Sequence, residues 1–167
     1  MEQERKSEIE EELHLARENW DSYRDNYKAR RFRKATSDLY FFCEHGAKAL
    51  LLTVGIDAQS HEGIRRMISM HFVKPGAIPV NVARYLGNLY DRRKTAEYSR
   101  QAGWEFTEEE VKTYTQWAGE SVKWFLKNII KNTPELAYGF GWWWQSLPLW
   151  PQRSPSANRC GFARRRT

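Results

Sequence analysis

Three consecutive basic residues, Arg92, Arg93 and Lys94, are the first candidates for chemistry in this sequence. Arg93 continues the spacing of an apolar helical stripe, so one charge falls in a register that should be buried. The stripe consists of Val82, Tyr85, Leu86, Leu89 and Ala96. A guanidinium binds a phosphate or carboxylate through paired hydrogen bonds but does not readily transfer a proton. We therefore interpret Arg93 as an anion-binding residue, with a structural ion pair to Glu44 or Asp38 as the alternative.

Two residues could supply the proton transfer that an arginine cannot. Tyr98 lies five positions beyond Arg93, but a phenol with a pKa of about 10 is a poor acid or base at neutral pH. An imidazole suits both tasks, yet no histidine follows His71. His61, next to the candidate helix cap Ser60, could replace it. Arg93, Tyr98 and His61 are the tentative catalytic residues, and Arg92, Arg93 and Lys94 are the predicted RNA- or nucleotide-binding residues.

Apolar residues recur at helical spacing in five segments, and no segment alternates as a strand does. The pattern predicts an all-α protein, an antiparallel up-and-down bundle of four long helices plus one shorter helix. We assign residues 1–137 to this bundle. The segments are residues 9–27, 32–54, 60–72, 79–96 and 107–129.

Short local signals mark where these helices begin and end. Ser60 can cap the short helix, and Thr107 with Glu110 forms a capping box before the last one. Gly55 is a natural stop for the second helix, and Pro79 suits the first turn of the fourth.

Residues 138–167 differ from the rest and are predicted to be an irregular tail rich in Trp and Arg. The segment holds Trp142 to Trp144 and five of the 27 basic residues, and it has no acids. The other 22 basic residues face 21 acids, so the net charge of +6 reflects the tail. The tryptophans could anchor the tail at a membrane interface, stack on bases or dock on a partner, or the tail could be an extension without an evolved function.

Composition excludes several classes of protein. Cys43 and Cys160 have no spacing typical of a metal site or a disulfide framework, and we expect neither a metal nor a cofactor. The N-terminus is acidic, which argues against a signal peptide, and no apolar run reaches the length of a transmembrane segment. We therefore expect a cytoplasmic protein.

Five stretches carry a family resemblance: Ala35 to Phe41, His45 to Leu51, Ser60 to Ile64, Leu89 to Tyr98 and Phe106 to Glu110. Together they resemble the HEPN domain family, over roughly residues 8–131. The residue Arg93 lies in the stretch that resembles the arginine-centred helix of the family, in the branch where four residues and a tyrosine follow the arginine.

The resemblance implies a helical bundle that usually forms a symmetric dimer. Such domains often work with a minimal nucleotidyltransferase or act as RNA-cleaving toxins. The ribonucleases carry a histidine four to six residues beyond the arginine, and here that window holds none. The leading hypothesis is therefore a homodimeric module that binds RNA, a nucleotide or a nucleotidyltransferase partner, with weak or absent nuclease activity.

Two alternatives remain. One is a metal-independent ribonuclease toxin that uses Arg93 with Tyr98 or His61. The other is a protein-interaction module that docks through the tail.

Overall fold

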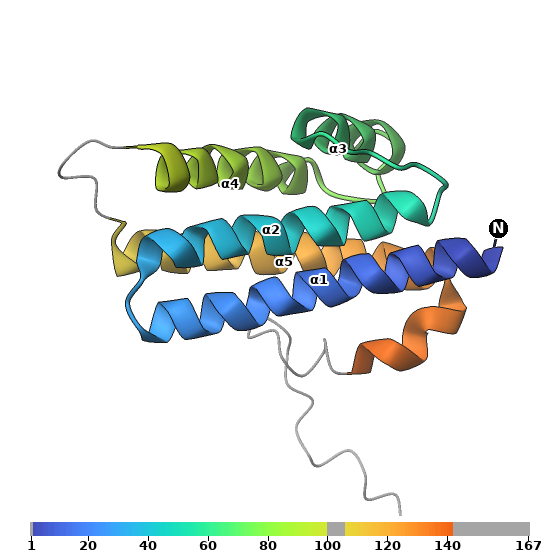
Figure 1. Cartoon of the computed structure of the whole chain (residues 1–167). Coiled ribbons are helices and arrows are strands. Elements are labelled where there is room, and N and C mark those ends of the chain that lie inside the picture. The colour runs from blue at the N-terminus through green and yellow to red at the C-terminus, as the bar shows by residue number, and fades with distance from the viewer. Residues whose placement is uncertain (1, 100–105, 142–167) are drawn as a thin grey trace, which may run out of the picture.

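All regular elements in residues 2–99 and 106–141, which the computed structural model describes, are helices. The four long helices are α1 (Glu2–Lys28), α2 (Phe32–Leu52), α4 (Val80–Tyr98) and α5 (Glu108–Asn132) (Figure 1). The shorter elements are α3 (His61–Ile68), the π-helix η1 (Ser69–Val73) and the 3₁₀-helix η2 (Pro134–Phe140). The predicted all-α bundle of four long helices plus one shorter helix is confirmed.

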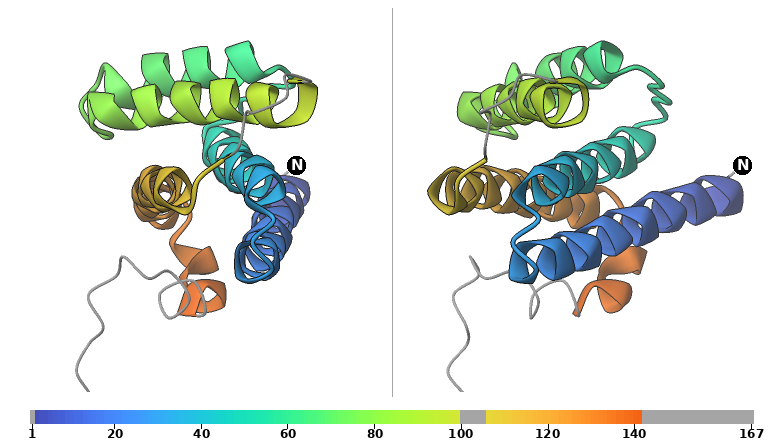
Figure 2. Two further views of the ribbon diagram at one scale, coloured as in Figure 1. Left: turned by 90° about the vertical axis from the view of Figure 1, so that its left-hand side faces the viewer. Right: turned by 60° about the vertical axis from the view of Figure 1, so that its left-hand side comes forward.

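Helix α2 forms the centre of the bundle and packs against α1, α3, α4 and α5. Twelve of its 21 residues are buried, as a helix with neighbours on most sides requires. Figure 2 shows α3 and α4 on one side of α2 and α1 on the other. Helices α1 and α2 run in opposite directions, as do α4 and α5 (Figure 1). The helices α3 and α4, which carry the functional candidates, therefore pack against the same central helix.

The local signals predict most helix boundaries correctly. Ser60 caps α3 by accepting a hydrogen bond from the Gly63 amide at 3.0 Å, and Thr107 and Glu110 form the expected capping box. Two details differ from the prediction. Pro79 is the N-cap of α4 and precedes its first turn. Helix α2 ends at Leu52, because the chain turns toward Gly55 at φ +76°, and this turn leaves Val54 45% exposed.

The predicted tail lies almost wholly outside the described residues. Tyr138 to Phe140 belong to η2, and residues 142–167 are not described. In the part of the chain that is described, no helix has both the length and the apolar character needed to cross a membrane. The assignment of residues 138–167 to a separate tail therefore stays a prediction.

Candidate functional site

Arg93 lies in the buried register of α4, as its spacing predicts, and its side chain is 14% exposed. Its Nη2 lies 2.9 Å from Oε2 of Glu97, one turn further along the same helix. The guanidinium also lies over the Phe41 ring, 4.8 Å from the ring centroid, and 5.7 Å from the centroid of Tyr40. The two ring contacts attach the C-terminal part of α4 to α2, whereas the ion pair with Glu97 stays within α4.

The acid that pairs with Arg93 is not one of the two predicted from the sequence. Asp38 instead accepts hydrogen bonds from Ser22 and Asn26 of α1, at 3.0 and 2.7 Å. Burial raises the pKa of Asp38, and these two donors lower it. Asp38 therefore belongs to the contact between α1 and α2.

His61 lies between Arg93 and the second predicted acid, Glu44. Its Nε2 is 3.3 Å from Nη1 of Arg93, and its Nδ1 is 2.6 Å from Oε1 of Glu44. The Glu44 side chain is only 6% exposed. The hydroxyl of Tyr40 also lies 2.6 Å from Nδ1. The three helices α2, α3 and α4 thus meet at one imidazole.

The neighbours of His61 fix which ring nitrogen carries the proton. A guanidinium can only donate, so Nε2 must be the acceptor in its contact with Arg93. The ring proton then resides on Nδ1, where the carboxylate of Glu44 accepts it. This arrangement leaves a lone pair on Nε2, the form of a histidine that can act as a general base. It resembles the carboxylate–histidine pairs in which the acid orients the ring.

Aromatic rings enclose the imidazole. The centroid of the Tyr90 ring lies 4.7 Å from that of His61, and Tyr40 packs edge-on at 5.4 Å. Burial, followed by the negative charge of Glu44, raises the pKa of Tyr40 well above that of a free phenol. Tyr40 therefore stays protonated at neutral pH. Its hydroxyl keeps a hydrogen-bond contact with His61, and its ring lines one side of the site.

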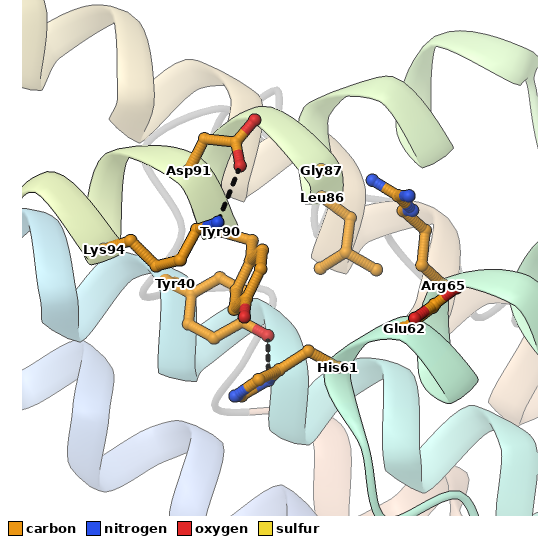
Figure 3. A pocket seen from close by; sticks show the side chains of 9 residues that line it. All are labelled: Tyr40, His61, Glu62, Arg65, Leu86, Gly87, Tyr90, Asp91 and Lys94. Atoms are coloured by element: carbon orange, nitrogen blue, oxygen red, sulfur yellow. Dashed lines mark hydrogen bonds and ion pairs between the residues drawn. The ribbon is translucent and has the colours of Figure 1, made fainter.

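A pocket of about 270 Å³ opens beside His61, between α2, α3 and α4 (Figure 3). Its lining includes two cations, Arg65 and Lys94, and Nζ of Lys94 lies 3.7 Å from Oδ1 of Asp91. Tyr40 and Tyr90 line the same space. The acids Glu62 and Asp91 line it as well, so the pocket presents a proton-transfer group, two cations, two carboxylates and aromatic faces to one ligand.

The sequence matches the family model of the HEPN domain over residues 9–129, which is most of the bundle. The chain belongs to the HEPN domain family. The recognition of the family from Arg93 and the surrounding stretches is thereby confirmed.

Several curated proteins are similar to this HEPN domain. A protein of Methanocaldococcus jannaschii named "Putative toxin MJ0605" is 27% identical over 125 residues, which cover 75% of this chain and 93% of that protein. A UPF0332 protein of Thermotoga maritima is 29% identical over 59% of this chain and 74% of its own length. A UPF0332 protein of Pyrococcus horikoshii is 37% identical over 47% of this chain and 56% of its own length.

The predicted site residues of the HEPN domain separate into two groups. Arg93 and His61 contact each other, and Lys94 lines the adjoining pocket. Arg92 does not line this pocket, and its positive charge acts to lower the pKa of Tyr114 on α5. Tyr98 is 71% exposed near the end of α4 and does not line this pocket. The structure therefore brings the histidine, and not the tyrosine, to the arginine.

Glu44 and the two tyrosines of the pocket were missed as site residues. Glu44 was considered only as an ion-pair partner for Arg93. A usable signal existed, because Glu44 lies one helical turn after Tyr40 and one before Ala47, both buried. A carboxylate in a buried register needs a partner, as Arg93 does. The sequence could have flagged Glu44 but could not have named His61 as its neighbour.

Proposed function

We propose that this HEPN domain is a metal-independent endoribonuclease in which His61 replaces the absent histidine at the end of α4. One observation carries the proposal: Nε2 of His61 is 3.3 Å from Arg93, while Glu44 holds Nδ1 at 2.6 Å. This geometry favours the alternative with His61 over the leading hypothesis of a binding module without nuclease activity. One M. jannaschii relative is named a putative toxin, which agrees with a toxin role.

The proposed reaction needs only groups that line or border the pocket. Nε2 of His61 accepts the proton of a ribose 2′-hydroxyl, and the 2′-oxygen attacks the adjacent phosphorus. The bond from phosphorus to the 5′-oxygen breaks, and that oxygen takes a proton from the imidazolium or from water. The products are a 2′,3′-cyclic phosphate and a 5′-hydroxyl.

Cations beside the imidazole would stabilise the charge that develops on the phosphate oxygens. Lys94 lines the pocket directly, and Nη1 of Arg93 contacts Nε2 of His61 at 3.3 Å. The 2′-hydroxyl must take the place of Arg93 on Nε2, because that lone pair accepts one hydrogen bond. The displaced Nη1 then becomes free to donate to the phosphate.

A second candidate function is binding of RNA, a nucleotide or a nucleotidyltransferase partner without cleavage. It is favoured by Arg65 and Lys94 in the pocket lining, because these cations can bind a phosphate whether or not His61 transfers a proton. We also propose that the protein acts as a homodimer in a toxin–antitoxin setting, as the family resemblance implies. Light scattering of the purified protein tests the homodimer. Co-purification with the product of a neighbouring nucleotidyltransferase gene tests the toxin–antitoxin setting.

Incubation of the purified protein with end-labelled RNA in excess EDTA tests the ribonuclease proposal. We expect cleavage, fragments that end in 2′,3′-cyclic phosphate, and protection of any linkage whose 2′-hydroxyl is replaced by hydrogen. Intact RNA at every protein concentration would overturn the proposal and leave the binding function. Cleavage at 2′-deoxy positions would overturn the mechanism.

A further inference from the structure

A second hollow continues from the His61 pocket along the outer face of the bundle. It lies between α4 and the continuous helical segment α3–η1, and its volume is about 590 Å³. The two hollows share Glu62, Arg65, Gly87 and Asp91 in their linings. A ligand that fills the pocket can therefore extend into this groove, which the proposed reaction does not use.

Four exposed cations line the groove: Arg65, Arg66, Lys74 and Arg84. Within the described residues none of them is paired with an acid. The lining also contains two acids, and one of these, Asp91, already contacts Lys94. The groove therefore carries an excess of positive charge that has no internal partner, which favours an anionic ligand.

Gly87 lets one of these cations reach the junction of pocket and groove. A Cβ atom at this position would lie 2.9 Å from Nη1 of Arg65, so the guanidinium lies directly on the backbone of α4. Glycine in a helix costs about 1 kcal/mol relative to alanine. Gly87 thus keeps Arg65 at the point that any ligand spanning both hollows must pass.

We propose that this groove binds the sugar–phosphate backbone of a single-stranded RNA next to the nucleotide held in the His61 pocket. The inference rests on the proposed function. The pocket, at about 270 Å³, lies below the range typical of drug-sized ligands, so it accommodates only a short part of a chain. Unpaired cations along the continuing groove match the next phosphates of that chain.

The side chains of the groove suit a nucleic acid better than an acidic peptide. Three of the four cations are arginines, whose planar guanidinium matches phosphate geometry. Peptide recognition usually depends on large apolar anchors, whereas Met70 and Ala83 are the main apolar contributions here. The aromatic walls of the adjoining pocket, Tyr40 and Tyr90, offer faces on which a base can stack.

Fluorescence anisotropy with a labelled single-stranded RNA tests the groove. The protein carries His61→Ala, so that binding is measured without cleavage. Adding Lys74→Ala with Arg84→Ala should weaken binding at least about tenfold, since each removes a charged contact. The plot of the logarithm of the RNA association constant against the logarithm of salt concentration has a negative slope. Its magnitude should fall by about 1.4, about 0.7 for each lost phosphate contact. The control is Arg24→Ala, an exposed arginine on α1, the helix on the other side of α2 from α3 and α4 (Figure 2).

Unchanged RNA affinity in the double variant, or an equal loss in Arg24→Ala, would overturn the proposal. If the double variant loses binding to poly-glutamate but keeps its binding to RNA, the groove belongs to an acidic protein partner instead. The two proposals fail separately. If the protein with His61 cleaves RNA but the groove variants bind it normally, only the groove assignment fails. If those variants lose RNA binding while the wild type cleaves nothing, only the ribonuclease assignment fails.

Discussion

Replacing Arg93 by alanine should destabilise the bundle, because this side chain joins α4 to both α2 and α3. The partly exposed ion pair with Glu97 contributes about 0.5–1 kcal/mol. The cation–π contact with Phe41 contributes about 1–2 kcal/mol, as the guanidinium is largely desolvated. The buried methylene stem contributes roughly another 1–2 kcal/mol.

One feature of Arg93 reduces the expected loss. Its Nε is buried and finds no acceptor among the described residues, and removing such a donor recovers about 1 kcal/mol. The net decrease in the free energy of unfolding should be about 2–3 kcal/mol. Arg93→Lys keeps the charge but loses the planar contacts, so it should fall between alanine and the wild type.

Urea denaturation followed by circular dichroism at a helical wavelength measures this change. The matched control is Arg92→Ala, the neighbouring arginine, whose one described interaction is the electrostatic influence on Tyr114. We expect a change below about 0.5 kcal/mol for the control. If Arg93→Ala is as stable as Arg92→Ala, the contacts of Arg93 do not hold the three helices together, and the reasoning is refuted.

Three further changes give measurable outcomes. Glu44→Gln removes the carboxylate that orients the imidazole and should lower kcat for RNA cleavage by about 10- to 100-fold while the helical content stays the same; a change within twofold would contradict this role. Gly87→Ala should raise the melting temperature, because alanine favours the helix by up to about 1 kcal/mol, yet weaken RNA binding severalfold by displacing Arg65. A lower melting temperature together with normal RNA binding in Gly87→Ala would contradict this prediction. Burial, then the hydrogen bond to Glu108 and its charge, raises the pKa of Tyr27 to about 12. The folded state therefore retains this proton more tightly than the unfolded state, and stability should fall as the pH rises from about 10 to about 12. Urea unfolding across that range should show a smaller fall in Tyr27→Phe, and an unchanged fall would exclude the contribution.

The fold could be predicted largely from the sequence, because local and periodic signals agree. The stripe of α5, which includes Val111, Ala118 and Ile129, is buried throughout. Thr107 and Ser60 begin their helices as their side-chain chemistry predicts. Helical periodicity identifies the buried face of each segment, and short connections make sequential helices antiparallel.

The candidate site could be predicted only in part. Periodicity identifies Arg93 as a charge in a buried register, but it cannot say which charge on another helix meets it. The partner proved to be Glu97, at the i, i+4 spacing that stabilises ion pairs within one helix. His61 joins the site because α3 packs back against α2 after the connecting loop. No local sequence signal predicts this packing. Tyr98 fits the motif of the family but is exposed near the end of α4.

The central claim is that His61 transfers the proton during RNA cleavage. Single-turnover cleavage in excess EDTA by the wild type, His61→Ala and His14→Ala tests it most directly, since His14 is an exposed histidine on α1. We predict that His61→Ala loses at least about 100-fold in rate, that added imidazole restores part of it, and that His14→Ala cleaves at the wild-type rate. Equal rates for His61→Ala and the wild type would contradict the claim.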